Sequence, residues 1–242
     1  MKFSLKQHFF IALQGITLFG LNYWLVYLAE MTLTSGLVAI IFSLVIFMNI
    51  LFSAIFLKIK IKPEVAVGAI LGVSGTALIF KNELKSFGLS DNNFVALVFC
   101  VISIILASLG NIISSRNQKF NIPVIQTNAF GMTYGALILF TIAMALGVDL
   151  KFNLEAGYIS SLLYLAVFGS IVAFTAYLKL LGNIGPDRSA YTILVVPIIA
   201  MLISTLFEGY IWQKSAIFGI ILLIAGNFFA MSKKLRIKRI VS

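Results

Sequence analysis

The chain has 242 residues, of which 61% are hydrophobic and 11% are charged, and its net charge is +10. Soluble domains carry charge on about a quarter of their residues, so this composition excludes a water-soluble fold and predicts a surface that faces lipid. One cysteine, Cys100, and one histidine, His8, exclude a disulfide framework, a Cys/His zinc site and haem held by two histidines. We therefore expect no cofactor and no metal.

Eight apolar runs are long enough to cross the hydrocarbon core, which takes about 20 residues of helix. Backbone groups in lipid must be satisfied within a helix or a closed barrel, and these runs are too long for barrel strands. The fold class is therefore predicted to be all-α, a polytopic membrane helix bundle with about eight transmembrane helices. In chain order the runs are 9–29, 33–57, 64–80, 93–115, 124–147, 156–181, 187–208 and 215–232.

The breaks between the runs carry helix start signals. Pro63, Pro123 and Pro186 each stand just before or at the start of a run, where the missing N–H is not needed. The segment 91–93, Asp-Asn-Asn, offers caps for the fourth helix. The first run could also be a secretory signal peptide, but it is too long for one and contains Gln14 and Asn22.

The positive residues indicate the orientation of the chain in the membrane. If the N-terminus is inside and the sides alternate, 14 of the 18 lysines and arginines lie on the inside. Cytoplasmic loops carry this excess, so both termini are predicted to be cytoplasmic and the helix number even. The same distribution, in short clusters without a basic helix or an RNA-binding strand motif, argues against nucleic acid as a partner. The only outside lysines are Lys81, Lys85, Lys151 and Lys214.

A weak internal repeat appears when the chain is shifted by about 150 residues. At this shift Gly68 falls on Gly219 and Gly75 on Gly226. The shift moves each helix by five positions, an odd number, so repeat partners cross the membrane in opposite directions, as in secondary transporters. We expect inverted five-helix repeats of which the first is incomplete: a partial first repeat of three helices over 1–92, a second repeat of five helices over 93–232, and a basic cytoplasmic tail over 233–242.

Several short motifs resemble EamA-type permeases of the drug/metabolite transporter superfamily. They are Ile184-Gly-Pro-Asp-Arg-Ser-Ala-Tyr191, Val196-Pro197, Ser204-Thr-Leu-Phe-Glu-Gly-Tyr210, Gly219 with Gly226-Asn227, Gly20-Leu-Asn-Tyr23, Thr34-Ser-Gly36 and Ala39-Ile-Ile41. The resemblance covers nearly the whole chain.

The resemblance implies a fold, an activity and a location. It implies helices in two inverted five-helix repeats, transport of small metabolites or drugs, and a place in the cell membrane, the inner membrane of a bacterium. The family pattern has ten helices, and this sequence begins where the third of them would begin. Where family halves often carry a proline and a glutamate, the first repeat has Phe47 and Lys58-Ile59, whereas the second keeps Pro197 and Glu208.

The fourth helix carries the best polar stripe. Small and polar residues recur on one helical face, and a buried asparagine needs a partner away from lipid. The stripe is interpreted either as a helix-packing surface or as a cavity wall on which Asn111 contacts substrate. Its members are Ser103, Ala107, Gly110, Asn111 and Ser114.

Four further residues complete the predicted substrate-binding set. Asn22 lies in the middle of the first run, and Asn128 shares a face of the fifth with Gly131 and Gly135. Either asparagine could bind substrate or only pack. The remaining two are Tyr164 and Thr192. Pro197, inside the seventh run, removes a backbone hydrogen bond and predicts a kink that could form a gate.

The other aromatic residues suit a different role. Tyrosine and tryptophan near helix ends are typical of interfacial belts, and this interpretation is favoured for Trp24, Tyr27, Tyr177, Tyr210 and Trp212.

These observations favour a permease over other classes. A mostly apolar pocket with a few polar groups suits small organic metabolites such as amino acids or drugs, moved by alternating access, so the expected partners are a small-molecule substrate and the lipid bilayer. A membrane-embedded enzyme would need a convergent acid, base, nucleophile or metal site, and the sequence shows none. A truncated, non-transporting remnant or a membrane subunit of the same family is the remaining alternative.

Overall fold

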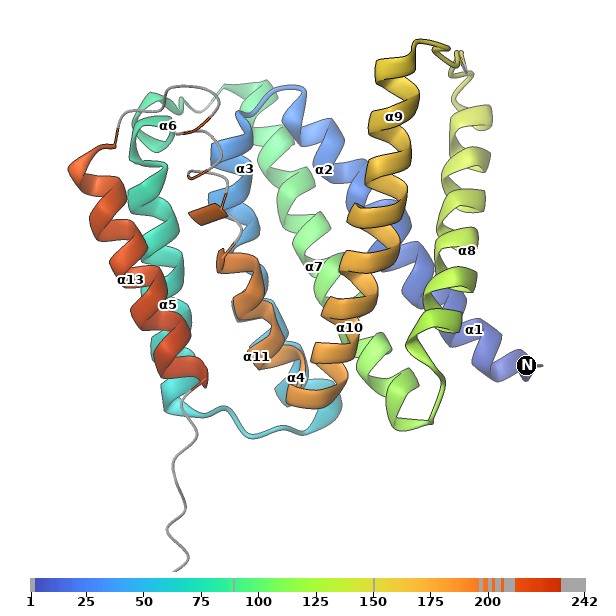
Figure 1. Cartoon of the computed structure of the whole chain (residues 1–242), viewed down its shortest axis with the longest axis horizontal. Coiled ribbons are helices and arrows are strands. Elements are labelled where there is room, and N and C mark those ends of the chain that lie inside the picture. The colour runs from blue at the N-terminus through green and yellow to red at the C-terminus, as the bar shows by residue number, and fades with distance from the viewer. Residues whose placement is uncertain are drawn as a thin grey trace, which may run out of the picture.

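The protein is a bundle of helices, shown in Figure 1 as a computed structural model. The structure describes residues 3–88, 90–149, 151–195, 198–199, 202, 206 and 212–231. Helices account for the regular structure of these residues, and no strand occurs among them. The predicted all-α class is confirmed.

The first run forms one unbroken span, Leu5–Glu30. It begins at a capping box, in which the Ser4 hydroxyl accepts from the Gln7 backbone N–H and the Gln7 side chain accepts from the Ser4 N–H. The span consists of α1 (Leu5–Gln14), a π-helical segment η1 (Gly15–Leu21) and α2 (Asn22–Glu30). The wider π-helical turn shifts the faces of α1 and α2 relative to each other.

The second run is divided in two. α3 (Ser35–Phe42) and α4 (Val45–Leu57) meet at Ser43, whose hydroxyl donates to the Ile40 carbonyl oxygen at 2.6 Å. Hydroxyl bonds of this kind bend helices. α5 (Pro63–Ile79) begins on Pro63, as predicted, and is followed by the short α6 (Lys81–Ser86).

The next three runs form long helices. α7 (Asp91–Lys119) is capped by Ser90, whose hydroxyl accepts from the Asn93 N–H, so the cap lies one residue before the predicted 91–93 segment. α8 (Val124–Ala145) follows the predicted break at Pro123. The sixth run is one span of α9 (Ala156–Tyr164), the π-helical η2 (Leu165–Val172) and α10 (Ala173–Ile184).

The seventh run is described only in part. It begins at Pro186 as predicted, with α11 (Pro186–Ser189) and a 3₁₀ segment η3 (Ala190–Val195). Pro197 and its predicted kink lie outside the described residues. The last helix is α13 (Lys214–Met231).

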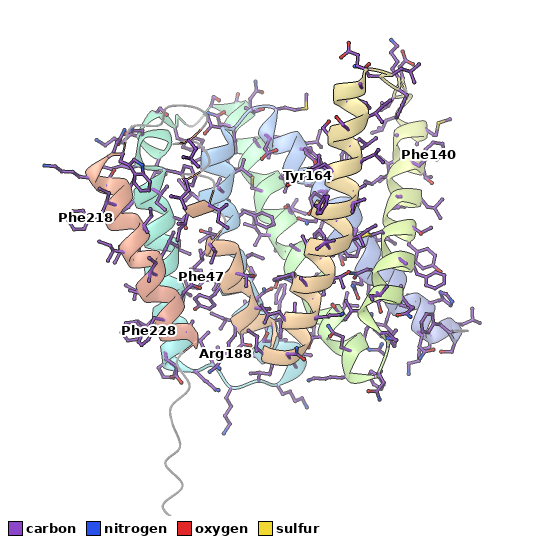
Figure 2. All side chains as sticks on the ribbon, viewed as in Figure 1. Phe47, Phe140, Tyr164, Arg188, Phe218 and Phe228 are labelled. Carbon is purple, nitrogen blue, oxygen red and sulfur yellow. The ribbon has the colours of Figure 1, made fainter. Side chains whose placement is uncertain are left out.

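The lengths and surfaces of the helices suit a membrane. Five spans are long and apolar enough to cross one, and α5 and α13 are shorter apolar helices. Large apolar side chains cover the flanks of the bundle, including Phe140 on α8 and Phe218 and Phe228 on α13 (Figure 2). Such a surface would be unstable in water and is stable in lipid.

The bundle has two ends. In Figure 1, α6 and the turn between α8 and α9 lie at the top, which we call the upper end. The turns that follow α4, α7 and α10 lie at the bottom, which we call the lower end. Lys151 therefore lies at the upper end and Lys60 at the lower end.

α5 and α13 pack against each other along glycines. A Cβ atom on Gly68 would lie 2.6 Å from the Gly226 carbonyl oxygen, and one on Gly75 would lie 2.6 Å from that of Gly219. Both distances are too short for any side chain, so the two backbones are in direct contact. Small residues permit such close approach in membranes.

A second set of glycines joins the first span to α8. A Cβ on Gly15 would lie 2.0 Å from the Gly131 carbonyl oxygen, and Gly20 faces Gly135. Gly131 and Gly135, four residues apart, therefore form a close-packing face of α8. The contact holds the first span between α7 and α8.

Candidate functional site

A cavity of about 760 Å³ lies inside the bundle. Its walls come from α2, from the α3–α4 bend, from α7, and from η2, α10 and η3. Glu30, the last residue of α2, and Phe80, which follows α5, line the cavity at the upper end. Asn111 and Tyr177 line it at a deeper level. The volume is within the range of small-molecule sites.

Asn22 lines the cavity at the first residue of α2. Its Oδ1 accepts a hydrogen bond from the Ser103 hydroxyl at 2.8 Å, and its Nδ2 donates to the Leu18 carbonyl oxygen at 3.3 Å. These bonds fix the amide and join the first span to α7.

Asn111 lies on α7 at the deep end of the cavity. Its Nδ2 donates to Oδ1 of Asn49 at 3.5 Å, and Asn49 in turn donates to the Pro186 carbonyl oxygen at 3.1 Å. The Asn111 Oδ1 is buried without a hydrogen-bond partner among the described groups. This chain links α7, α4 and α11 below the cavity.

Tyr177 completes the deep end. Its hydroxyl is buried beside Ser189, Asn111 and Asn49, and in the described residues it makes no direct hydrogen bond of standard geometry. A buried hydroxyl usually has a partner, so it and the Asn111 oxygen are two polar atoms that a bound molecule could satisfy.

Thr192 also lines the cavity, on η3. Its hydroxyl donates to the Ser189 carbonyl oxygen at 2.7 Å, a bond that leaves the hydroxyl oxygen free to accept. Asn22, Asn111 and Thr192, which come from three different predicted runs, are thus brought to one cavity.

Aromatic rings form much of the remaining wall. Tyr23 and Phe174 stand edge to face, with ring centroids 6.1 Å apart and an interplanar angle of 72°. Phe42 and Phe80 contribute from α3 and from the turn after α5. The cavity is therefore mostly apolar, with polar groups confined to a few points.

The other predicted site residues lie elsewhere. Asn128 is buried between α8 and α10, where its Nδ2 reaches the Thr175 hydroxyl at 3.5 Å, and it does not line the cavity. Tyr164, labelled in Figure 2 where α9 meets η2, is 62% exposed and does not line the cavity. Their roles in binding stay predictions.

The predicted stripe of α7 serves two purposes. Its five members are all buried on one face, as expected. Ala107 and Asn111 line the cavity, whereas Gly110 packs against Leu18 and Ser103 bonds to Asn22. The packing interpretation and the cavity interpretation therefore each hold for part of the stripe.

Sequence reasoning missed two residues of the site. The interfacial-belt interpretation is wrong for Tyr177, because its hydroxyl is buried at the deep end of the cavity. Asn49 was not singled out, although it stands in the middle of an apolar run, as Asn22 does. The rule that a mid-membrane amide points inward would have found it.

Known proteins resemble the chain over most of its length. It is 28% identical over 232 residues to "Uncharacterized inner membrane transporter YedA" of Escherichia coli (strain K12), which spans 92% of this chain and 72% of that protein. An "Uncharacterized transporter" of Archaeoglobus fulgidus is 22% identical over 227 residues, 91% of this chain and 77% of that protein.

The fold also occurs in a solved crystal structure. It aligns with a TM-score of 0.78 at 14% identity and covers 91% of this chain and 75% of that one. The bundle and its apolar flanks define a multi-pass membrane protein. The chain belongs to the EamA-like transporter family, whose signature matches residues 94–232.

Proposed function

We propose that the protein moves small organic solutes, such as amino acids or drugs, across the membrane by alternating access. The observation that carries the proposal is the cavity itself: an apolar space of about 760 Å³ with isolated polar groups contributed by both halves of the chain. Asn22 and Asn111 come from the first half, and Thr192 from the second. Such a site orients an organic molecule through a few hydrogen bonds.

The two π-helical segments support an inverted repeat around this cavity. A shift of 150 residues takes 15–21 to 165–171, and the structure has π-helix at Gly15–Leu21 and Leu165–Val172. Both segments reach the cavity, through Leu18 and Gly169. π-Helical turns are frequent at functional sites.

The glycine contacts between α5 and α13 support the same symmetry. Gly68 meets Gly226 and Gly75 meets Gly219. A two-fold rotation that exchanges the antiparallel helices takes Gly68 to Gly219 and Gly75 to Gly226, which are also the pairs of the sequence repeat. Transporters built this way rock one repeat against the other.

We propose that the cavity faces the outside in this structure. With the N-terminus inside, the lower end is cytoplasmic and the upper end external. The cavity reaches the upper end at Glu30, whereas the amide chain from Asn111 to Pro186 lies between its deep end and the lower end. Alternating access would require that chain of hydrogen bonds to break.

Cysteine labelling can test on which side of the membrane the upper and lower ends of the bundle lie. Lys60→Cys and Lys151→Cys are introduced separately with Cys100→Ser, and intact cells of a bacterial host are treated with a membrane-impermeant maleimide. Only the Lys151→Cys protein should react. Reaction of both single-cysteine proteins would contradict the inverted arrangement.

The activity can be tested in proteoliposomes. Purified protein should move at least one solute from a panel of phenylalanine, leucine, uridine and ethidium, and Asn111→Ala should lower that flux about tenfold, equivalent to about 1.4 kcal/mol. Asn153→Ala, an exposed loop substitution, is the matched control and should keep the flux. Absence of flux for the entire panel would contradict the proposal.

A further inference from the structure

We infer that the transported solute carries a positive charge, as an organic ammonium group on an apolar body. This inference rests on the proposed transport function and names the class of substrate that the cavity selects. It is carried by the charge, the aromatic rings and the free hydrogen-bond acceptors of the cavity wall.

Among the residues that the structure describes, the cavity wall has one formal charge. Glu30 is the only Asp, Glu, Lys, Arg or His among the described residues that line it. The chain as a whole has 18 basic and 8 acidic residues. From that composition a charged residue in the cavity wall would more often be basic, yet the one described there is a carboxylate. A cation entering from the upper end meets attraction at Glu30, whereas an anion meets repulsion.

The position of Glu30 adds to this negative potential. It is the last residue of α2, where the carbonyl groups of the final turn carry the negative end of the helix dipole. Because Glu30 is exposed, the contribution of the dipole is small and solvent-screened. Across the described part of the chain the salt bridge found is Lys151 to Asp149, so Glu30 has no ion-pair partner there.

The aromatic wall suits the same ligand. Tyr23, Phe42, Phe80 and Phe174 line the space between Glu30 and the deep end. Ring faces attract ammonium groups through their quadrupole, and the attraction grows when the site is shielded from water. The same rings provide apolar surface for the body of the solute.

The deep end offers acceptors. The Asn111 amide nitrogen is already bonded to Asn49, while its Oδ1 has no partner among the described groups, and the Tyr177 hydroxyl lies beside it without a direct bond. An N–H donor of a protonated amine satisfies the Asn111 oxygen, whereas a carboxylate would meet its unpaired lone pairs. The Tyr177 hydroxyl can donate or accept, so it does not discriminate between the two. The Asn111 oxygen at the deep end thus favours a hydrogen-bond donor over a carboxylate, and Glu30 at the upper end favours a cation.

The test compares three probes that share a phenyl ring and a short chain: phenethylammonium, 2-phenylethanol and 3-phenylpropionate. Binding to the purified full-length protein in detergent is measured by titration at neutral pH. Phenethylammonium should bind at least tenfold more tightly than the alcohol, and 3-phenylpropionate more weakly than either.

Two variants locate the selectivity. Glu30→Gln should lower the affinity for phenethylammonium about tenfold and leave 2-phenylethanol unchanged. Glu155→Gln removes an exposed carboxylate that lies at the upper end but does not line the cavity. It should change neither the affinity for phenethylammonium nor that for 2-phenylethanol. The probe ranking of the unsubstituted protein stands as a test of its own if Glu30→Gln does not fold.

Each contrary result has a distinct meaning. Equal binding of the ammonium and the alcohol by the unsubstituted protein would overturn the charge selectivity and leave the transport proposal standing. An equal loss in Glu155→Gln would also overturn it, because the effect would then come from the general surface charge. Folded protein that binds none of the three probes would contradict both proposals.

Discussion

The spans Leu5–Glu30 and Ala156–Ile184 are built alike and packed differently. Each has a π-helical segment in its middle, and the two segments correspond under the same sequence shift. The most apolar 18-residue stretch of the first span is 39% buried, whereas the corresponding stretch of the second span is 0% buried. The π-helical turn therefore does not depend on dense packing around it.

The difference shows that the first span is tightly packed in the bundle and that the second is less constrained. The first span is in backbone contact with α8 through Gly15 and is hydrogen-bonded to α7 through Asn22. The second span is held mainly at α10, where Leu178 and Leu181 are buried and Gln118 donates to the Leu178 carbonyl oxygen at 2.8 Å. Its upper half, α9 and η2, has no buried residue and is therefore weakly restrained.

The sharpest test of this contrast replaces one glycine in each span. Gly15→Ala should destabilise the protein by about 3 kcal/mol, the upper part of the range for overpacking, because its Cβ would lie 2.0 Å from the Gly131 carbonyl oxygen. Gly169→Ala, inside η2, should change stability by less than about 1 kcal/mol, since its nearest neighbour is Leu165 at 3.7 Å.

Unfolding in detergent, followed by circular dichroism against temperature or denaturant, measures both variants. Similar losses for the two glycines would mean that the spans are equally constrained, and the contrast would be lost.

A smaller effect is expected from the amides that tie each span to a neighbour. Asn22→Ala removes a 2.8 Å bond and leaves the buried Ser103 hydroxyl unpaired, which should destabilise the protein by about 1 kcal/mol. Asn128→Ala removes the 3.5 Å contact with Thr175 and should lower stability by no more than about half as much. The same unfolding assay compares the two variants. A larger loss of stability for Asn128→Ala than for Asn22→Ala would contradict the conclusion that the first span is the more tightly packed.

The smallest effect is expected at Tyr164. Tyr164→Leu should change stability by less than about 0.5 kcal/mol, because the ring is 62% exposed and an apolar replacement is equally suited to lipid. Solute flux in proteoliposomes should also stay within twofold of the unsubstituted protein. A large loss of flux would show that the binding site extends along η2 beyond the cavity.

Most of the fold could be predicted from the sequence because lipid imposes simple rules. Apolar runs longer than a strand must be helices, and prolines mark where they begin, as Pro63, Pro123 and Pro186 do. The division of the second run at Ser43 and the π-helical turns were not predicted. They depend on individual hydroxyl bonds and on the spacing of neighbouring helices, which hydropathy does not record.

The candidate site was less predictable. Asn22 and Asn111 were found because an amide in the membrane must avoid lipid, and both line the cavity. The same rule gives no way to separate them from Asn128, which is equally buried but bonds to a helix neighbour. Tyr177 seemed interfacial because sequence position gives the depth of a residue but not the direction in which its side chain points.

The glycine contact between α5 and α13 has a mechanical consequence. Where two helices meet through side chains, a change in their crossing angle forces those side chains into new rotamers. Gly68, Gly75, Gly219 and Gly226 have no rotamers and bring backbone against backbone, but side chains such as Ile79 and Leu223 pack directly beside them. A change in the angle between the two helices would therefore have to repack these side chains, so we expect α5 and α13 to move as one unit.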